Sequence, residues 1–145
     1  MGQLALERMG VSSLFDEVKI NPQYQRSVNL RHDFGIADSF GGFICHHSAQ
    51  VVVETLAKQI SSTSQRAFTI TGPYGGGKST LLNLLASAIC RKPEVRLLAR
   101  QKLDEKSLRF VDEALPCGPN GWSVLTLVGS RSDLVPALLE AVTEG

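Results

Sequence analysis

The sequence predicts an α/β domain in which a small parallel β-sheet is flanked by helices on both faces. A β-prone run at residues 67–71 enters a glycine-rich turn, and apolar residues recur at helical spacing over 81–89. A second β-prone run at residues 122–128 precedes another apolar helical pattern at 134–143. Because only two strands are recognisable, we expect the sheet to be small or incomplete.

Length and composition favour one domain without a membrane segment. The chain has 145 residues and a formal net charge of +1, which indicates neither a nucleic-acid-binding stripe nor an acidic tail. No apolar run approaches the roughly 20 residues that span a bilayer, and the first residues lack a signal-peptide pattern. Three unpaired cysteines indicate free thiols. We therefore expect a cytoplasmic protein with no membrane partner.

The chain is predicted to form an irregular N-terminal region and one domain. Residues 1–47 are an irregular region, with a short amphipathic turn at 12–18 and chain breakers at 21–22 and 41–42. The domain proper is expected over 48–145 and opens with a helix that Ser48 caps and that ends before the polar run 61–65. Cys45, His46 and His47 have no second ligand pair nearby, so local packing is favoured over a metal site.

The glycine-rich turn fits the pattern G-x-x-x-x-G-K-[ST], in which each residue type serves phosphate binding. The matching residues are Gly72, Pro73, Tyr74, Gly75, Gly76, Gly77, Lys78, Ser79 and Thr80. Glycines let successive backbone N–H groups point at an anion, and the helix that follows adds its positive N-terminal end. Lys78 would bind phosphate oxygens, and the Ser79 hydroxyl would ligate Mg²⁺. The sequence therefore predicts a nucleotide site here.

Strand, loop and helix together resemble the P-loop NTPase superfamily over residues 66–90, with 72–80 as the Walker A motif. The loop is most similar to those of AAA+ or STAND-like ATPases and of ABC or SMC-type ATPases. GTPase base-reading motifs do not occur in the chain. The resemblance implies ATP and Mg²⁺ as ligands and a catalytic role for Lys78. It also suggests the N-terminal portion of a large bacterial ATPase in DNA processing or phage defence.

After the loop helix, Pro93 is expected to open a new helix, and charged helical segments follow. Residues 108–113 also resemble a Walker B strand, on which Asp112 would hold the metal and Glu113 would orient water. Arg109 interrupts the apolar run that a buried strand needs. Apolar residues there also recur at helical spacing. We favour a helix, with the strand as the alternative.

The segment 124–134 resembles the sensor-1 strand of AAA+ ATPases, in which Ser130 would face the γ-phosphate. A core strand that precedes the true Walker B is the preferred alternative, so the nucleotide-binding domain is expected to stop short of Walker B. Arg131 as an arginine finger is a weaker hypothesis.

These patterns favour a domain that binds ATP–Mg²⁺ and hydrolyses it poorly. One alternative is a P-loop kinase or phosphotransferase, with a lid supplied by Arg96, Arg100 and Arg109. Another is a non-hydrolysing, nucleotide-dependent binding module. An incomplete sheet would leave open edges, so a protein partner or self-association is expected. Nucleic acid is expected as a partner only through a full-length parent protein.

Overall fold

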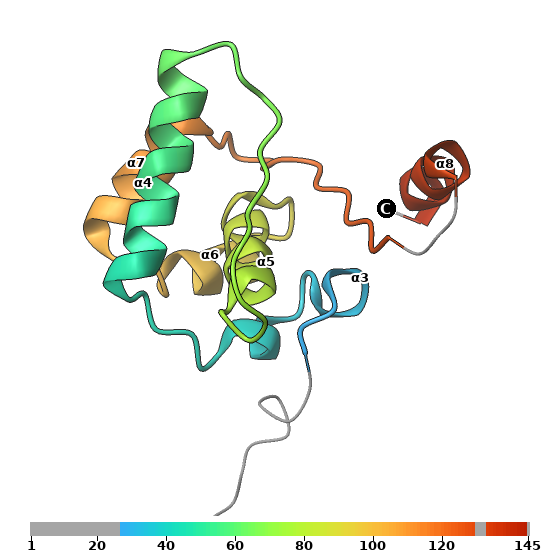
Figure 1. Ribbon diagram of the computed structural model, residues 1–145, viewed down its shortest axis with the longest axis horizontal. Coiled ribbons are helices and arrows are strands. Elements are labelled where there is room, and N and C mark those ends of the chain that lie inside the picture. The colour runs from blue at the N-terminus through green and yellow to red at the C-terminus, as the bar shows by residue number, and fades with distance from the viewer. Residues whose placement is uncertain (1–26, 130–132, 145) are drawn as a thin grey trace, which may run out of the picture.

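The structure is a computed structural model that describes residues 27–129 and 133–144, and its ordered elements are helices (Figure 1). In chain order they are α3 (Leu30–Asp33), the 3-10 helix η2 (Ala37–Phe40), α4 (His47–Ser62), α5 (Lys78–Ile89), α6 (Pro93–Arg100), α7 (Glu105–Ala114) and α8 (Leu134–Glu144). The turn expected at 12–18 lies outside the described residues.

The predicted α/β fold with a parallel sheet is wrong. Within the described ranges the strand-like pairing amounts to one isolated parallel bridge between Cys90 and Trp122, where the Trp122 N–H donates to the Ile89 carbonyl at 2.7 Å. The β-prone runs 67–71 and 122–128 are extended, but they do not form a ladder. They run in different directions (Figure 1). Two short strands would at best form a marginal sheet, so helix packing supplies the core instead.

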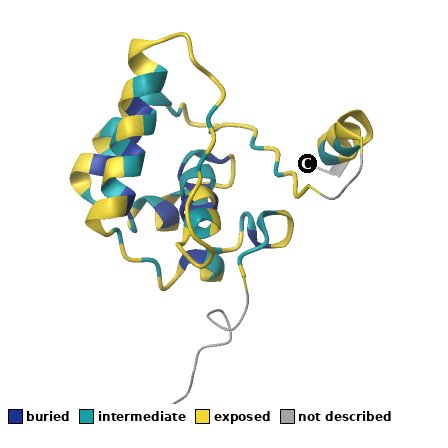
Figure 2. Ribbon diagram, in the orientation of Figure 1, coloured by how far each residue is buried: buried dark blue, intermediate teal, exposed yellow. Residues whose placement is uncertain are grey.

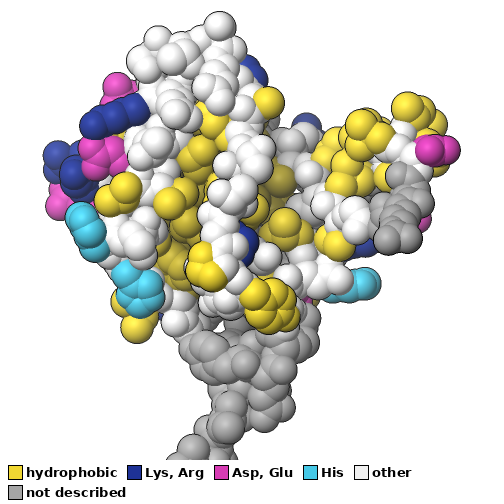
Figure 3. Space-filling view, viewed as in Figure 1, with side chains coloured by type: hydrophobic (Ala, Val, Ile, Leu, Met, Phe, Trp, Pro, Cys, Tyr) yellow, Lys and Arg dark blue, Asp and Glu magenta, His cyan; other side chains and the backbone are white. Residues whose placement is uncertain are grey.

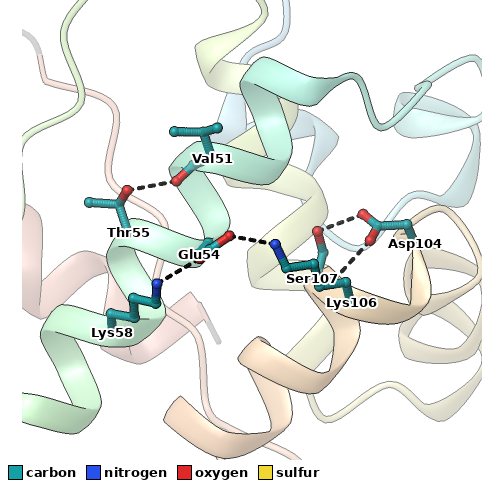
Figure 4. Close-up of polar contacts among 7 residues, drawn as sticks. All are labelled: Val51, Glu54, Thr55, Lys58, Asp104, Lys106 and Ser107. Carbon is teal, nitrogen blue, oxygen red and sulfur yellow. Dashed lines mark hydrogen bonds and ion pairs between the residues drawn. The ribbon is translucent and has the colours of Figure 1, made fainter.

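Helices α4 and α7 pack side by side and form one half of the fold. Ala49, Val53 and Ala57 are buried on α4 at intervals of four residues, which places them on one face. The helix begins two residues earlier than expected, because its N-cap is His46 rather than Ser48. At the surface, the Glu54 carboxylate accepts hydrogen bonds from Lys58 on α4 and Lys106 on α7 (Figure 4).

Asp104 caps α7 and anchors its first turn. Its carboxylate accepts hydrogen bonds from the Ser107 backbone N–H at 3.0 Å and the Ser107 hydroxyl at 2.6 Å (Figure 4). These bonds lower the pKa of Asp104 to about 2, because they stabilise the charged carboxylate. The Cys45 thiol also donates to Asp104 at 3.3 Å. Burial raises the pKa of Cys45, so this thiol is stabilised in its neutral form.

Helices α5 and α6 form the other half. The prediction that Pro93 opens a helix is confirmed, since it occupies the first turn of α6. The predicted helix over 81–89 is confirmed as the greater part of α5, which buries Leu81, Leu84 and Ala88. Leu82 points outward and is 38% exposed, as helical periodicity requires of its position.

One hydrophobic core joins the two halves, and its buried residues lie toward the middle of the fold (Figure 2). Its members are Phe40, Ala49, Val53, Leu81, Leu84, Ala88, Ala99, Leu103 and Val111. Phe40 is 2% exposed, so the short helix η2 contributes to the same core as α4, α5, α6 and α7. Residues 37–40 thus belong to the packed body that carries the glycine-rich loop.

Helix α8 stands apart from this core at the right of the view (Figures 1 and 3). Leu134, Val135, Leu139 and Val142 are each at least 60% exposed. An ion pair of 2.9 Å between Glu140 and Arg31 of α3 connects α8 to the body. Within the described ranges, no helix has the length and apolarity that a membrane crossing requires.

Candidate functional site

The glycine-rich loop lies at the surface and enters α5 directly. Gly75 and Gly77 have φ values of 76° and 73°, in the left-handed region that glycine adopts without strain. The Gly76 N–H donates to the Pro73 carbonyl at 3.3 Å and closes the turn. A Cβ at Gly76 would lie 3.2 Å from the same carbonyl oxygen. The loop conformation therefore depends on glycine at these positions.

Lys78 is the first residue of α5, and its side chain folds back over the loop. Its ammonium donates to the carbonyl oxygens of Gly72 at 3.0 Å and Pro73 at 2.7 Å. Among the described residues no carboxylate pairs with this ammonium. The ammonium charge of Lys78 therefore lies at the loop and can be neutralised by an anionic ligand or by ions from solvent.

The N-terminus of α5 adds backbone donors to the same place. The N-cap is Gly77, which has no side chain to accept a hydrogen bond from the first turn. Within the part of the chain that the structure describes, the N–H groups of residues 78–80 have no hydrogen-bond acceptor. Uncapped N–H groups of a first helical turn carry a partial positive charge and bind anions.

These features fit the triphosphate of a nucleotide with Mg²⁺. The loop supplies backbone donors, an ammonium and two hydroxyls, which are the groups that phosphate and its metal ion require. Ser79 is exposed and Thr80 is half-buried, so Ser79 is the more accessible of these two hydroxyl residues. Tyr74 at the loop tip is 93% exposed, and its hydroxyl lies 2.9 Å from the Ser27 hydroxyl oxygen.

The strand interpretation of residues 108–113 is wrong, since they belong to helix α7. Asp112 forms two hydrogen bonds to the Arg100 guanidinium, at 2.8 and 2.7 Å. This pairing raises the pKa of Arg100. Asp112 and its neighbour Glu113 lie on the helix that packs against α4, whereas the loop precedes α5. Ser130 and Arg131, the residues of the sensor-1 and arginine-finger hypotheses, lie outside the described residues.

The three arginines that the kinase alternative would place in a lid form contacts within the fold. Arg96 donates to the carbonyls of Cys90 at 3.0 Å and Pro119 at 2.9 Å. Arg100 binds Asp112 as above, and Arg109 pairs with Glu105 one helical turn earlier. Their guanidinium groups thus fix α6, α7 and the 116–121 loop.

One buried polar contact of α5 was not predicted from the sequence. Asn83 of α5 is 0% exposed, and its side-chain amide donates to the Ser39 hydroxyl at 2.6 Å and the Asp33 carbonyl at 3.3 Å. These bonds tie residues 33–39 to the helix that carries Lys78. The sequence did offer one indication of it, because an asparagine lies among the apolar residues of this helix. A buried amide requires hydrogen-bond partners.

No protein-family model, curated protein or solved structure matches this chain significantly.

Proposed function

We propose that this chain binds ATP–Mg²⁺ through residues 72–80. The observation that carries the proposal is the loop itself, in which left-handed glycines lead into an uncapped helix and the Lys78 ammonium lies over the turn. The Lys78 charge and the free backbone N–H donors of α5 therefore lie together at one site that is open to solvent.

Each part of the loop has a distinct role in this proposal. The glycines keep side chains away from the phosphates, so the backbone N–H groups can approach them. Lys78 exchanges part of its bonding to the Gly72 and Pro73 carbonyls for phosphate oxygens. The Ser79 hydroxyl would hold Mg²⁺, and the bound ion would neutralise part of the phosphate charge.

The proposal favours binding with little turnover by this chain alone. Hydrolysis needs a group that orients the attacking water, in addition to a phosphate cradle. Asp112 of α7, one of two candidate carboxylates, is paired with Arg100 of α6. The chain then acts as a nucleotide-dependent binding module, or as the nucleotide-binding portion of an ATPase. The DNA-related or defence role of such an ATPase is implied by the resemblance alone.

We also propose a cytoplasmic location. Cys45, Cys90 and Cys117 are free thiols, which is the state that a reducing compartment maintains. ATP–Mg²⁺ as the ligand agrees with that assignment.

Equilibrium binding of ATP and GTP with Mg²⁺, measured together with phosphate release, tests the proposal. The wild-type protein should bind ATP, and Lys78→Ala should bind at least about tenfold more weakly because it loses a charge-assisted contact. Lys58→Ala is a matched control, since it removes an exposed lysine from α4. Circular dichroism establishes that all three proteins are folded. Equal ATP affinity in wild type and Lys78→Ala would overturn the proposal.

A further inference from the structure

A groove lies at the opposite end of α5 from the glycine-rich loop. It has a volume of about 280 Å³ and is bordered by α3, by the chain that follows α5, by the extended segment 122–126 and by Ala141 of α8. Its lining includes Arg31, Phe34, Arg91, Lys92, Trp122 and Thr126. Three cations and two aromatic rings therefore border one small cavity.

Two of these cations are not neutralised inside the fold. Arg91 and Lys92 are exposed, and among the described residues neither side chain forms an ion pair or hydrogen bond. Arg31, by contrast, pairs with Glu140 of α8 at 2.9 Å. The groove thus carries a positive charge that suits an anionic ligand.

Trp122 offers a fixed aromatic surface beside these charges. Its backbone N–H bonds to Ile89, and its indole N–H donates to the Pro116 carbonyl at 3.2 Å, so the ring is held from two sides. It nevertheless remains 43% exposed. A fixed, partly exposed ring next to unpaired cations is the arrangement on which a nucleic-acid base stacks while its phosphate binds the cations.

We propose that this groove binds a nucleotide unit of single-stranded nucleic acid, with the base on Trp122 and the flanking phosphates on Arg91 and Lys92. An acidic peptide would use the cations but would leave the aromatic ring without a partner. Double-stranded nucleic acid would keep its bases stacked within the duplex, out of reach of the ring. The observations therefore favour a single strand over either.

The groove is independent of the proposed ATP site. Lys78 begins α5, and Cys90 to Lys92 follow its last residue, so the two sites are separated by a helix of 12 residues. That length corresponds to about 18 Å. Variants at one site therefore leave the groups of the other in place, and the failure of one proposal does not imply the failure of the other.

Trp122 is the single tryptophan of the chain, so its fluorescence reports on the groove directly. Titration with an oligothymidylate of eight nucleotides should quench this fluorescence, because a base stacks on the indole. An abasic oligomer of equal length keeps the phosphates without the bases, and it should bind about tenfold more weakly. Equal affinity for the two oligomers, or no quenching by either, would overturn the proposal.

Variants distinguish the contribution of the cations to oligomer affinity from that of base stacking. The affinity is measured by fluorescence anisotropy of a labelled oligomer. Arg91→Gln with Lys92→Gln should lower the slope of log affinity against log salt by about 1.4. Trp122→Ala should weaken binding about tenfold, and Trp122→Phe should restore most of it. The matched control is Lys58→Gln with Lys106→Gln, which removes equal charge beside the ring of Phe110 on the other half of the fold. An equal loss of affinity in this control would contradict the assignment.

Two further ligands decide the identity of the occupant. Thymidine 5′-monophosphate should bind more weakly than the oligomer, because it offers one phosphate instead of several. A mononucleotide that binds as tightly as the oligomer would contradict the single-strand assignment, and tight binding of a polyglutamate peptide would contradict nucleotide stacking. Lys78→Ala should bind the oligomer like wild type.

Discussion

At the scale of single residues, the backbone conformation of Gly77 sets the geometry of the proposed phosphate site. Its φ of 73° is left-handed, and a Cβ built there would meet nothing within 4 Å. Gly77→Ala therefore acts through conformational strain alone, worth about 1–2 kcal/mol. We expect it to weaken ATP binding about tenfold in an equilibrium titration.

Asparagine provides the matched control at this position. It tolerates the left-handed region better than other non-glycine residues, so Gly77→Asn should retain more affinity than Gly77→Ala. If both variants bound ATP like wild type, the left-handed conformation would have no part in binding.

Asp104 connects a single pKa to the stability of α7. Its folded pKa of about 2 lies below the usual 3.8 of an aspartate, so the ionised carboxylate stabilises the fold above pH 4 and loses that effect as the pH falls toward 2. Asp104→Ala should lower the free energy of unfolding at pH 7 by about 1 kcal/mol, as the loss of an N-cap does. Urea unfolding of wild type and Asp104→Ala at pH 7 and pH 3 measures the cost of the substitution and its dependence on pH.

Asp104→Asn separates the cap from the charge, because asparagine is an equally good N-cap without a titrating group. The variant should remain close to wild type at pH 7 and lose less stability between pH 7 and pH 3. A wild-type pH dependence in Asp104→Asn would assign the acid sensitivity to other groups.

At the scale of elements, α5 connects the loop to the core through one face. Leu84 is 0% exposed, whereas Leu82 on the other face is 38% exposed. Leu84→Ala should lower the free energy of unfolding by about 2–5 kcal/mol, because it leaves a cavity in the packed core. Leu82→Ala should cost less than half as much, and a comparable cost for both in urea unfolding would contradict the observed helix orientation.

Helix positions were largely predictable from the sequence, because apolar spacing, Pro93 and the polar ends of segments are local signals. The two predicted strands, by contrast, do not form a sheet. Residues 67–71 and 122–128 have strand composition, but a ladder requires a neighbour that local composition does not specify. The pattern of residues 72–80 identified the candidate site, including its glycines and Lys78. The contacts of Asn83 with Ser39 and Asp33 join residues that are 44 and 50 positions apart in sequence, and no local pattern indicated them.

At the scale of the whole molecule, much apolar surface remains uncovered. Leu139 and Val142 of α8 are 63% and 60% exposed, and Leu125 and Val128 of the preceding segment are 46% and 50% exposed. Surface of this kind drives association. We expect concentration-dependent self-association in sedimentation velocity, reduced by Leu139→Lys with Val142→Lys.

A control with two lysines on polar surface separates this effect from net charge. Thr55→Lys with Gln101→Lys adds the same charge at exposed positions on α4 and after α6. Association that both double variants reduce equally would assign the effect to charge rather than to the apolar surface of α8.

Residues 72–80 are proposed above to form a nucleotide-phosphate site. The most direct measurement is the amide NMR spectrum of glycine-labelled protein during titration with ATP and Mg²⁺. The proposal predicts saturable shifts for Gly75, Gly76 and Gly77, with Gly118 unaffected and with no such shifts in Lys78→Ala. Unchanged loop glycines in a folded protein, or the same shifts in Lys78→Ala, would contradict it.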